Sequence, residues 1–258
     1  MPEMSAYGDG VPSWIDLASP DMAASKAFYT ALFGWEAFTP PVPEAGGYTL
    51  FSIGGKQVAG AGPIMSQEQP PAWTTYVNVT DADGTAKKIA DAGGNLLMGP
   101  MDVMDQGRMA LFADPSGAVL GLWQPGTHTG AQLVNEPGTY CWSELATRDV
   151  EGSKAFYGAV FGWEASTEAA GPMEYTEFKV GGNSIAGMYA IGPDSPEDMP
   201  PHWGVYFAVA DCDAAVGTAS TLGATVFEAP TDIPVGRFAV LRDPQGAFFR
   251  MVKLSAPM

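Results

Sequence analysis

The stretch WIDLASPDMAASKAFYTALFGWEA, residues 14–37, returns with small changes as WSELATRDVEGSKAFYGAVFGWEA at residues 142–165. Two blocks inside it are identical in both copies, SKAFY at 25–29 and 153–157 and FGWEA at 33–37 and 161–165. A repeat of this quality at one fixed spacing indicates a duplicated unit. We therefore expect two halves with the same architecture.

Working outward from the first copy, the alternation at 13–18 predicts a strand, and Asp21 is a suitable N-cap for a helix that ends at Gly34. Three strands are predicted after it, at 35–38, 48–53 and 58–64. The pattern begins again at Trp73 with a strand, a helix after Asp81 and strands at 95–98, 108–113 and 118–123. The second half repeats this order, so the chain is predicted to be an α+β protein of four βαβββ modules.

The same pattern divides the chain. We expect a flexible N-terminus at 1–10, a first domain of two modules at 11–125, a linker at 126–137 and a second domain of two modules at 138–258. The linker is rich in Gly, Pro, Thr and Asn, and its one histidine, His128, is expected to face solvent.

The amino-acid composition argues against several kinds of partner. Among 258 residues, 12 are basic and 29 acidic, for a net charge of −17. Such a field repels phosphate backbones, so nucleic acid is not expected as a partner. No apolar run approaches the roughly 20 residues of a membrane helix, and the start does not look like a secretion signal. With only two cysteines, we expect a cytoplasmic protein. The expected partner is a small-molecule ligand, and the expected state is a monomer or homodimer.

The order of strand, Asp21, Phe28-Tyr29 and Phe33-Gly34-Trp35, together with its copy and the Asp-Pro-x-Gly turns at 114–117 and 243–246, resembles the vicinal oxygen chelate superfamily. That superfamily includes glyoxalases, extradiol dioxygenases and bleomycin-binding proteins. The resemblance covers about residues 12–254 and is strongest to two-domain actinobacterial glyoxalase-like or hydroxylase-like proteins. It implies two tandem half-open barrels, each built from paired modules. Because the superfamily holds enzymes and binders, the fold leaves the function open.

The resemblance also implies where a divalent metal would sit, on the first strand of each module and the last strand after the turn. Counting along the strands maps the ligand positions to Trp14, Thr74 and Gly121 in the first half and to Trp142, Gly204 and Arg250 in the second. None is a histidine or carboxylate, so no cofactor and no metal ligands are expected. The alternative is a shifted metal site that uses Glu144 and His202, although a nearby Arg250 would then pair with Glu144.

Asp16 and Glu144 follow the mapped positions by two residues, so strand alternation places them on the same inward face. They are the candidate catalytic residues, as general bases or polar anchors, unless they are engaged in salt bridges or exposed. The other candidates for ligand contact are aromatic, cationic or imidazole side chains expected on the inner faces, and some of them could simply fill the barrels: Trp14, Trp123, Trp142, Tyr48, Tyr175, His202 and Arg250.

The preferred hypothesis is a glyoxalase- or bleomycin-resistance-like protein that binds a small, partly aromatic or apolar organic ligand without the superfamily metal. One alternative is an enzyme, either a glyoxalase-type lyase on a shifted metal site or a metal-free enzyme that uses Asp16 or Glu144 as base. Another is an interaction protein with filled barrels. Arg108 and Arg237, each after a glycine, are expected to pair with acidic residues, and Cys141 is expected to be buried.

Overall fold

A computed structural model describes residues 3–170, 173–193 and 195–256. Each half of the chain forms one mixed sheet of eight strands, in the order β2-β3-β4-β1-β5-β8-β7-β6 and β10-β11-β12-β9-β13-β16-β15-β14. The elements of the first half are β1 (Pro12–Ser19), α1 (Met22–Phe33), β2 (Glu36–Phe38), the short helix η1 (Pro43–Ala45), β3 (Thr49–Ile53), β4 (Lys56–Pro63), β5 (Ala72–Asn78), α2 (Ala82–Asp91), β6 (Asn95–Val103), β7 (Gly107–Ala113) and β8 (Val119–Pro125). Those of the second half are β9 (Tyr140–Thr147), α3 (Val150–Phe161), β10 (Glu164–Ala170), β11 (Met173–Val180), β12 (Asn183–Ala190), β13 (His202–Ala208), α4 (Cys212–Thr221), β14 (Thr225–Ile233), β15 (Gly236–Arg242) and β16 (Phe248–Leu254).

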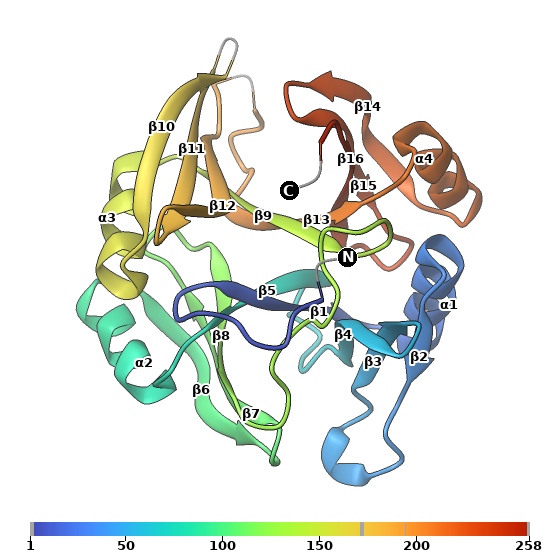
Figure 1. Cartoon of the computed structure of the whole chain (residues 1–258), viewed down its shortest axis with the longest axis horizontal. Helices are drawn as coiled ribbons and strands as arrows, with labels where there is room; N and C mark the ends of the chain where they lie inside the picture. Colours follow the sequence, from blue (N-terminus) through green and yellow to red (C-terminus); the bar gives the residue numbers. More distant parts are fainter. Residues whose placement is uncertain (1–2, 171–172, 194, 257–258) are drawn as a thin grey trace.

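The predicted α+β class and the four βαβββ modules are confirmed. In each sheet the first strands of two modules pair antiparallel, β1 with β5 and β9 with β13. Both sheets curl, and neither closes into a barrel, since β2 and β6, like β10 and β14, remain at opposite ends (Figure 1). Each sheet is thus a half-open trough made of two modules.

The duplicated stretch forms β1–α1 and β9–α3, and its local signals behave as the sequence predicts. The Asp21 carboxylate accepts the N–H groups of Ala23 and Ala24, and Gly34 ends α1 with a φ of 71°. Asp149 and Gly162 perform the same two tasks for α3. Because the cap and the left-handed glycine act within one turn, both ends of these helices could be located from sequence.

The helices join the two halves. α1 contacts α4, and α2 contacts α3, so the helices lie in two pairs at opposite flanks of the molecule (Figure 1). Tyr29 of α1 donates its hydroxyl to Asp243 of the second half at 2.8 Å, and Tyr157 of α3 donates to Asp114 of the first half at 2.8 Å. The SKAFY block therefore serves core packing between halves.

The linker lies along the first sheet. The backbone of Gln132 donates to the carbonyl of Gln57 on β4 at 2.7 Å, and that of Ala131 donates to Ser13 on β1 at 2.8 Å. The N-terminal segment adds to it, because the Tyr7 hydroxyl donates to the Ala131 carbonyl at 2.6 Å. Within the described ranges, no helix has the length and apolar character required to traverse a bilayer.

Candidate functional site

Strand alternation gives the first strand of each half two different faces. On β1, Ile15 and Leu17 are fully buried in the core, whereas Trp14 and Asp16 point to the opposite, inner face of the sheet. β9 repeats this arrangement. The carboxylate two residues after the tryptophan is thereby placed in the trough of each half, as the sequence predicts.

In the first half the carboxylate belongs to what we call the Asp16 cluster: Trp14, Asp16, Tyr48 and Tyr76. The hydroxyls of Tyr48 and Tyr76 each donate to Asp16 Oδ2 at 3.2 Å, and Trp14 Nε1 donates to the Tyr48 hydroxyl at 3.0 Å. Part of Asp16 stays accessible, yet the protein surrounds it so closely that burial raises its pKa to about 6, against the opposing effect of the two tyrosines. A carboxylate of this kind can accept a proton near neutral pH.

The second half builds the Glu144 cluster from the equivalent residues: Trp142, Glu144, Tyr175 and Tyr206. Tyr175 donates to Glu144 Oε1 at 2.8 Å, Tyr206 donates to Oε2 at 2.6 Å, and Trp142 Nε1 donates to the Tyr175 hydroxyl at 3.0 Å. The glutamate side chain, one carbon longer than that of aspartate, thus accepts one hydrogen bond on each oxygen. Asp16 accepts both of its tyrosine hydrogen bonds on a single oxygen. Glu144 is only 8% exposed, so it is held as an oriented hydrogen-bond acceptor.

Glycines on the neighbouring strand make room for these tyrosines. A Cβ at Gly60, which pairs with Asp16, would overlap the Tyr48 hydroxyl, and a Cβ at Gly187, which pairs with Glu144, would overlap that of Tyr175. Both tyrosine hydroxyls can therefore reach the carboxylate only because the facing position has no side chain.

A buried cation lies beside the Glu144 cluster. Arg250 on β16 is 6% exposed, and its guanidinium carbon is 5.4 Å from the centre of the Tyr206 ring. Its Nη2 is 3.2 Å from Nε2 of His202, whose Nδ1 is 2.9 Å from the Pro200 carbonyl oxygen. A carbonyl can only accept, so Nδ1 carries the ring proton and Nε2 accepts from Arg250. Burial lowers the pKa of His202, in keeping with this neutral form.

The expected salt bridge between Arg250 and Glu144 is wrong. Among the described residues, Arg250 forms no ion pair, because the Glu144 oxygens point to Tyr175 and Tyr206 instead. Glu144 still lies near enough for its negative charge to stabilise the charged form of Arg250. Burial by itself would lower the pKa of the Arg250 guanidinium. The interactions with Tyr206, Tyr189 and Glu144 are larger in sum than this effect of burial, so the pKa is raised.

His128 corrects a second expectation, since it is not a solvent-facing linker residue. Its ring stands edge-on to Trp14 with 4.4 Å between centroids, and edge-on to Trp123 at 5.5 Å. Nδ1 lies 3.0 Å from Gln57 Oε1, Nε2 is buried without a hydrogen-bond partner among the described residues, and burial lowers the pKa of the ring to about 4. The linker thus places a neutral imidazole over the tryptophan of the Asp16 cluster.

The remaining predicted residues have structural partners. Trp123 donates its Nε1 to the His128 carbonyl at 2.9 Å. As expected, Arg108 pairs with Asp83 and Asp102, and its counterpart Arg237 pairs with two aspartates of α4 and β14. Cys141 is buried, also as expected.

The positions that the superfamily uses for metal ligands are filled by other groups. The ring of Tyr76 occupies the space that a side chain at Gly121 would need, and the Arg250 guanidinium occupies that of Gly204. The shifted alternative does not fit either, since both ring nitrogens of His202 are engaged. No group of three His, Cys, Asp or Glu side chains suited to a metal occurs in the part of the chain that the structure describes. These residues do not fit a divalent metal, and its absence stays a prediction.

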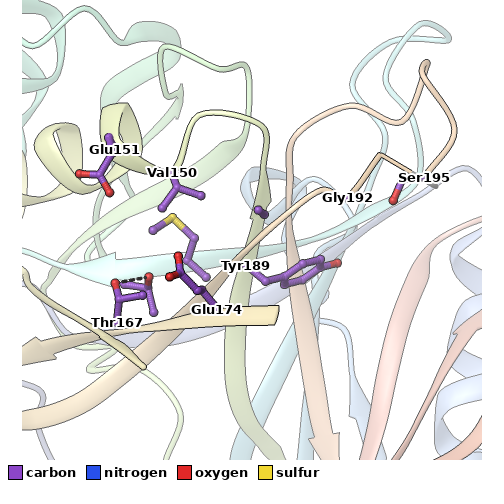
Figure 2. A pocket seen from close by; sticks show the side chains of 10 residues that line it. Val150, Glu151, Thr167, Glu174, Tyr189, Gly192 and Ser195 are labelled. Carbon is purple, nitrogen blue, oxygen red and sulfur yellow. Dashed lines mark hydrogen bonds between the residues drawn. The ribbon is translucent and has the colours of Figure 1, made fainter. Parts of the chain in front are cut away.

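A pocket of about 500 Å³ lies in the second half, and its lining includes none of the four residues of the Glu144 cluster (Figure 2). The start of α3 contributes Val150 and Glu151, and Thr167 on β10 bonds to Thr176 on β11 at 2.8 Å beneath it. Tyr189, on one side of this pocket, is also the neighbour of Arg250. The hydroxyl pair recurs as Thr39 and Thr49 in the first half at 2.7 Å, which indicates a structural role for the threonines.

Sequence reasoning missed the second tyrosine of each cluster. Tyr76 is the direct cross-strand neighbour of Trp14, and Tyr206 that of Trp142. Both stand two residues after a mapped metal position, so the parity that placed Asp16 and Glu144 also predicts that these tyrosines face inward.

Comparisons with known proteins agree with this geometry. The family model described as Glyoxalase/Bleomycin resistance protein/Dioxygenase superfamily matches residues 12–122 and 139–251. The CFP32 protein of Mycobacterium bovis, whose name carries a provisional glyoxylase assignment, is 44% identical over 259 residues, 98% of each chain. The anthracycline biosynthesis protein DnrV of Streptomyces peucetius is 42% identical over 265 residues, 97% of this chain and 96% of that one.

Among solved structures, the Mn(II)-bound glyoxalase of Novosphingobium aromaticivorans aligns with a TM-score of 0.64 at 14% identity, covering 97% of this chain and 86% of the other. At that identity the likeness concerns the fold alone. With both halves matched by the family model and relatives above 40% identity along nearly the whole length, the chain belongs to the glyoxalase/bleomycin resistance protein/dioxygenase superfamily.

Proposed function

We propose that this protein binds a small, hydroxylated aromatic molecule on the inner face of its second sheet, at the Glu144 cluster, without a metal ion. The observation that carries the proposal is a carboxylate with both oxygens oriented by tyrosine hydroxyls, among aromatic rings and beside a guanidinium. Trp142 and Tyr175 are partly accessible and can contact a ligand ring. A ligand hydroxyl would donate to Glu144.

The relatives support a small organic ligand. One carries glyoxylase in its name, and another is named for anthracycline biosynthesis. The Asp16 cluster is the weaker binding candidate, because His128 of the linker covers Trp14 there.

One observation favours a second candidate, metal-free proton transfer by Asp16. Its pKa of about 6 lies near neutral pH, as general-base catalysis requires. Under this hypothesis Asp16→Asn abolishes turnover of a ligand with an acidic C–H bond, whereas Glu144→Gln leaves turnover at Asp16 intact.

The binding proposal is tested with naphthol, a neutral hydroxylated aromatic, titrated into the intact chain after treatment with a chelator. Glu144→Gln is expected to weaken binding about tenfold, since a hydrogen bond to a charged acceptor is worth roughly 1.5–3 kcal/mol. Asp16→Asn is the matched control in the other half and should leave the affinity unchanged.

Equal affinities for wild type and Glu144→Gln would contradict the location of the site. Binding that is lost with the chelator and restored by a divalent metal would contradict its metal-free character. Circular dichroism of each variant establishes that it is folded before the affinities are compared.

A further inference from the structure

The Arg250 guanidinium is a charged group whose environment in the described structure is incomplete. It is 6% exposed and has no carboxylate partner among the described residues. By contrast, the partly exposed Arg108 and Arg237 each bind two aspartates. A buried charge is costly unless it is paired. Glu144 offsets this cost through its charge but makes no direct contact, so the guanidinium keeps hydrogen-bond donors from which an anion could accept.

The contacts of Arg250 orient it without neutralising it. His202 accepts from Nη2 through a neutral ring, because its other nitrogen donates to the Pro200 carbonyl. The Tyr206 ring, 5.4 Å from the guanidinium carbon, adds a cation–π contact that also leaves the charge in place. Gly204 provides the space for the guanidinium, since any Cβ there would overlap it. The strand neighbours thus hold the planar fork in position.

Two carboxylates face the same region. Glu144 is committed to Tyr175 and Tyr206, and Glu228 on β14 is exposed, with a pKa raised by burial and partly lowered again by Arg250. Glu144 presents an acceptor and Arg250 presents donors. Together, Glu144 and Arg250 match a ligand that carries a hydroxyl donor next to an anionic acceptor. Glu228 is exposed, so water screens its charge and weakens its effect on Arg250.

We propose that Arg250 is a carboxylate-binding subsite, so that the ligand of the Glu144 cluster is an aromatic hydroxy acid with its hydroxyl on Glu144 and its carboxylate on the guanidinium. This inference rests on the proposed function and names its ligand class. His202 acts as a positioning residue that keeps the guanidinium in its orientation. The planar fork of arginine suits a carboxylate through two parallel hydrogen bonds.

The test compares salicylate with salicylamide, which has the same ring and hydroxyl but no charge. For the intact wild-type chain, salicylate is expected to bind about ten- to a hundredfold more tightly, as charge-assisted hydrogen bonds predict. Arg250→Met is expected to remove this preference and leave the salicylamide affinity nearly unchanged. Arg108→Gln is the matched control, with the same loss of charge at a partly exposed arginine that is already paired with aspartates, and it should keep the preference.

Arg250→Lys covers the case in which Arg250→Met does not fold. It keeps the charge and loses the fork, so we expect a preference that is reduced and not abolished. Equal wild-type affinities for the two probes would overturn the carboxylate subsite, and if naphthol still bound in a Glu144-dependent manner the proposed function would stand. Failure of all three probes to bind would overturn both. A preference that survives Arg250→Met would assign the carboxylate to another residue.

Discussion

The Asp16 and Glu144 clusters share a tryptophan, a carboxylate and two tyrosines, and they differ in what surrounds this frame. Thr74 and Gly121 of the first half correspond to Gly204 and Arg250 of the second. The first cluster is covered by a neutral histidine from the linker, and the second holds a buried guanidinium. Duplication has thus kept one hydrogen-bonded frame in two electrostatic environments. This difference is the basis for proposing proton transfer at the first cluster and anion binding at the second.

The largest expected difference between the two clusters is in how the free energy of unfolding depends on pH. Because burial raises the Asp16 pKa from 3.8 to about 6, the folded state binds the proton more tightly than the unfolded state, and ionisation opposes folding. The penalty is absent below the unfolded pKa, grows as pH rises between the two values and is complete above about 6, at about 3 kcal/mol. Asp16→Asn should therefore gain about 2 kcal/mol relative to wild type between roughly pH 4.5 and 7.5, measured by urea unfolding. A constant difference across that range would show that Asp16 titrates normally.

A reciprocal exchange tests the cation environment. Gly204→Thr places the first-half residue in the second half, where its Cβ overlaps the Arg250 guanidinium. Displacing a buried side chain by overpacking should lower the free energy of unfolding by about 2 kcal/mol. The matched change, Thr74→Gly, only removes a side chain from a strand and should cost about 1 kcal/mol. Thermal and urea unfolding of both variants give the comparison, and equal losses would mean that Arg250 is easily rearranged.

An effect of similar size separates the two tyrosine pairs. Tyr206→Phe removes the 2.6 Å bond to Glu144 Oε2, whereas Tyr76→Phe removes one of two 3.2 Å bonds to the same Asp16 oxygen. We expect losses of about 2 and about 1 kcal/mol, because hydrogen bonds to a charged acceptor strengthen as they shorten. Urea midpoints at neutral pH measure both. A larger loss for Tyr76→Phe would reverse the proposed order.

Much of the fold follows from signals that act locally. The Asp21 cap, the Gly34 stop and the inward parity of Asp16 depend on neighbours within a few residues, and all three were predictable. The position of His128 was not, because the path of the linker is set by long-range backbone bonds such as that of Gln132 to Gln57. Arg250 was misassigned because parity brings it near Glu144 but does not show that two tyrosines already satisfy that carboxylate.

The reciprocal bonds of Tyr29 to Asp243 and of Tyr157 to Asp114 have a consequence for assembly. Each half inserts the hydroxyl of its own helix into the last turn of the other, as the two subunits of a symmetric dimer do across a shared axis. The two halves of the chain therefore pack against each other as two subunits would, and the linker joins them covalently. Because the exchange is closed within one chain, these surfaces are already occupied, and any association between separate copies must use other faces of the molecule.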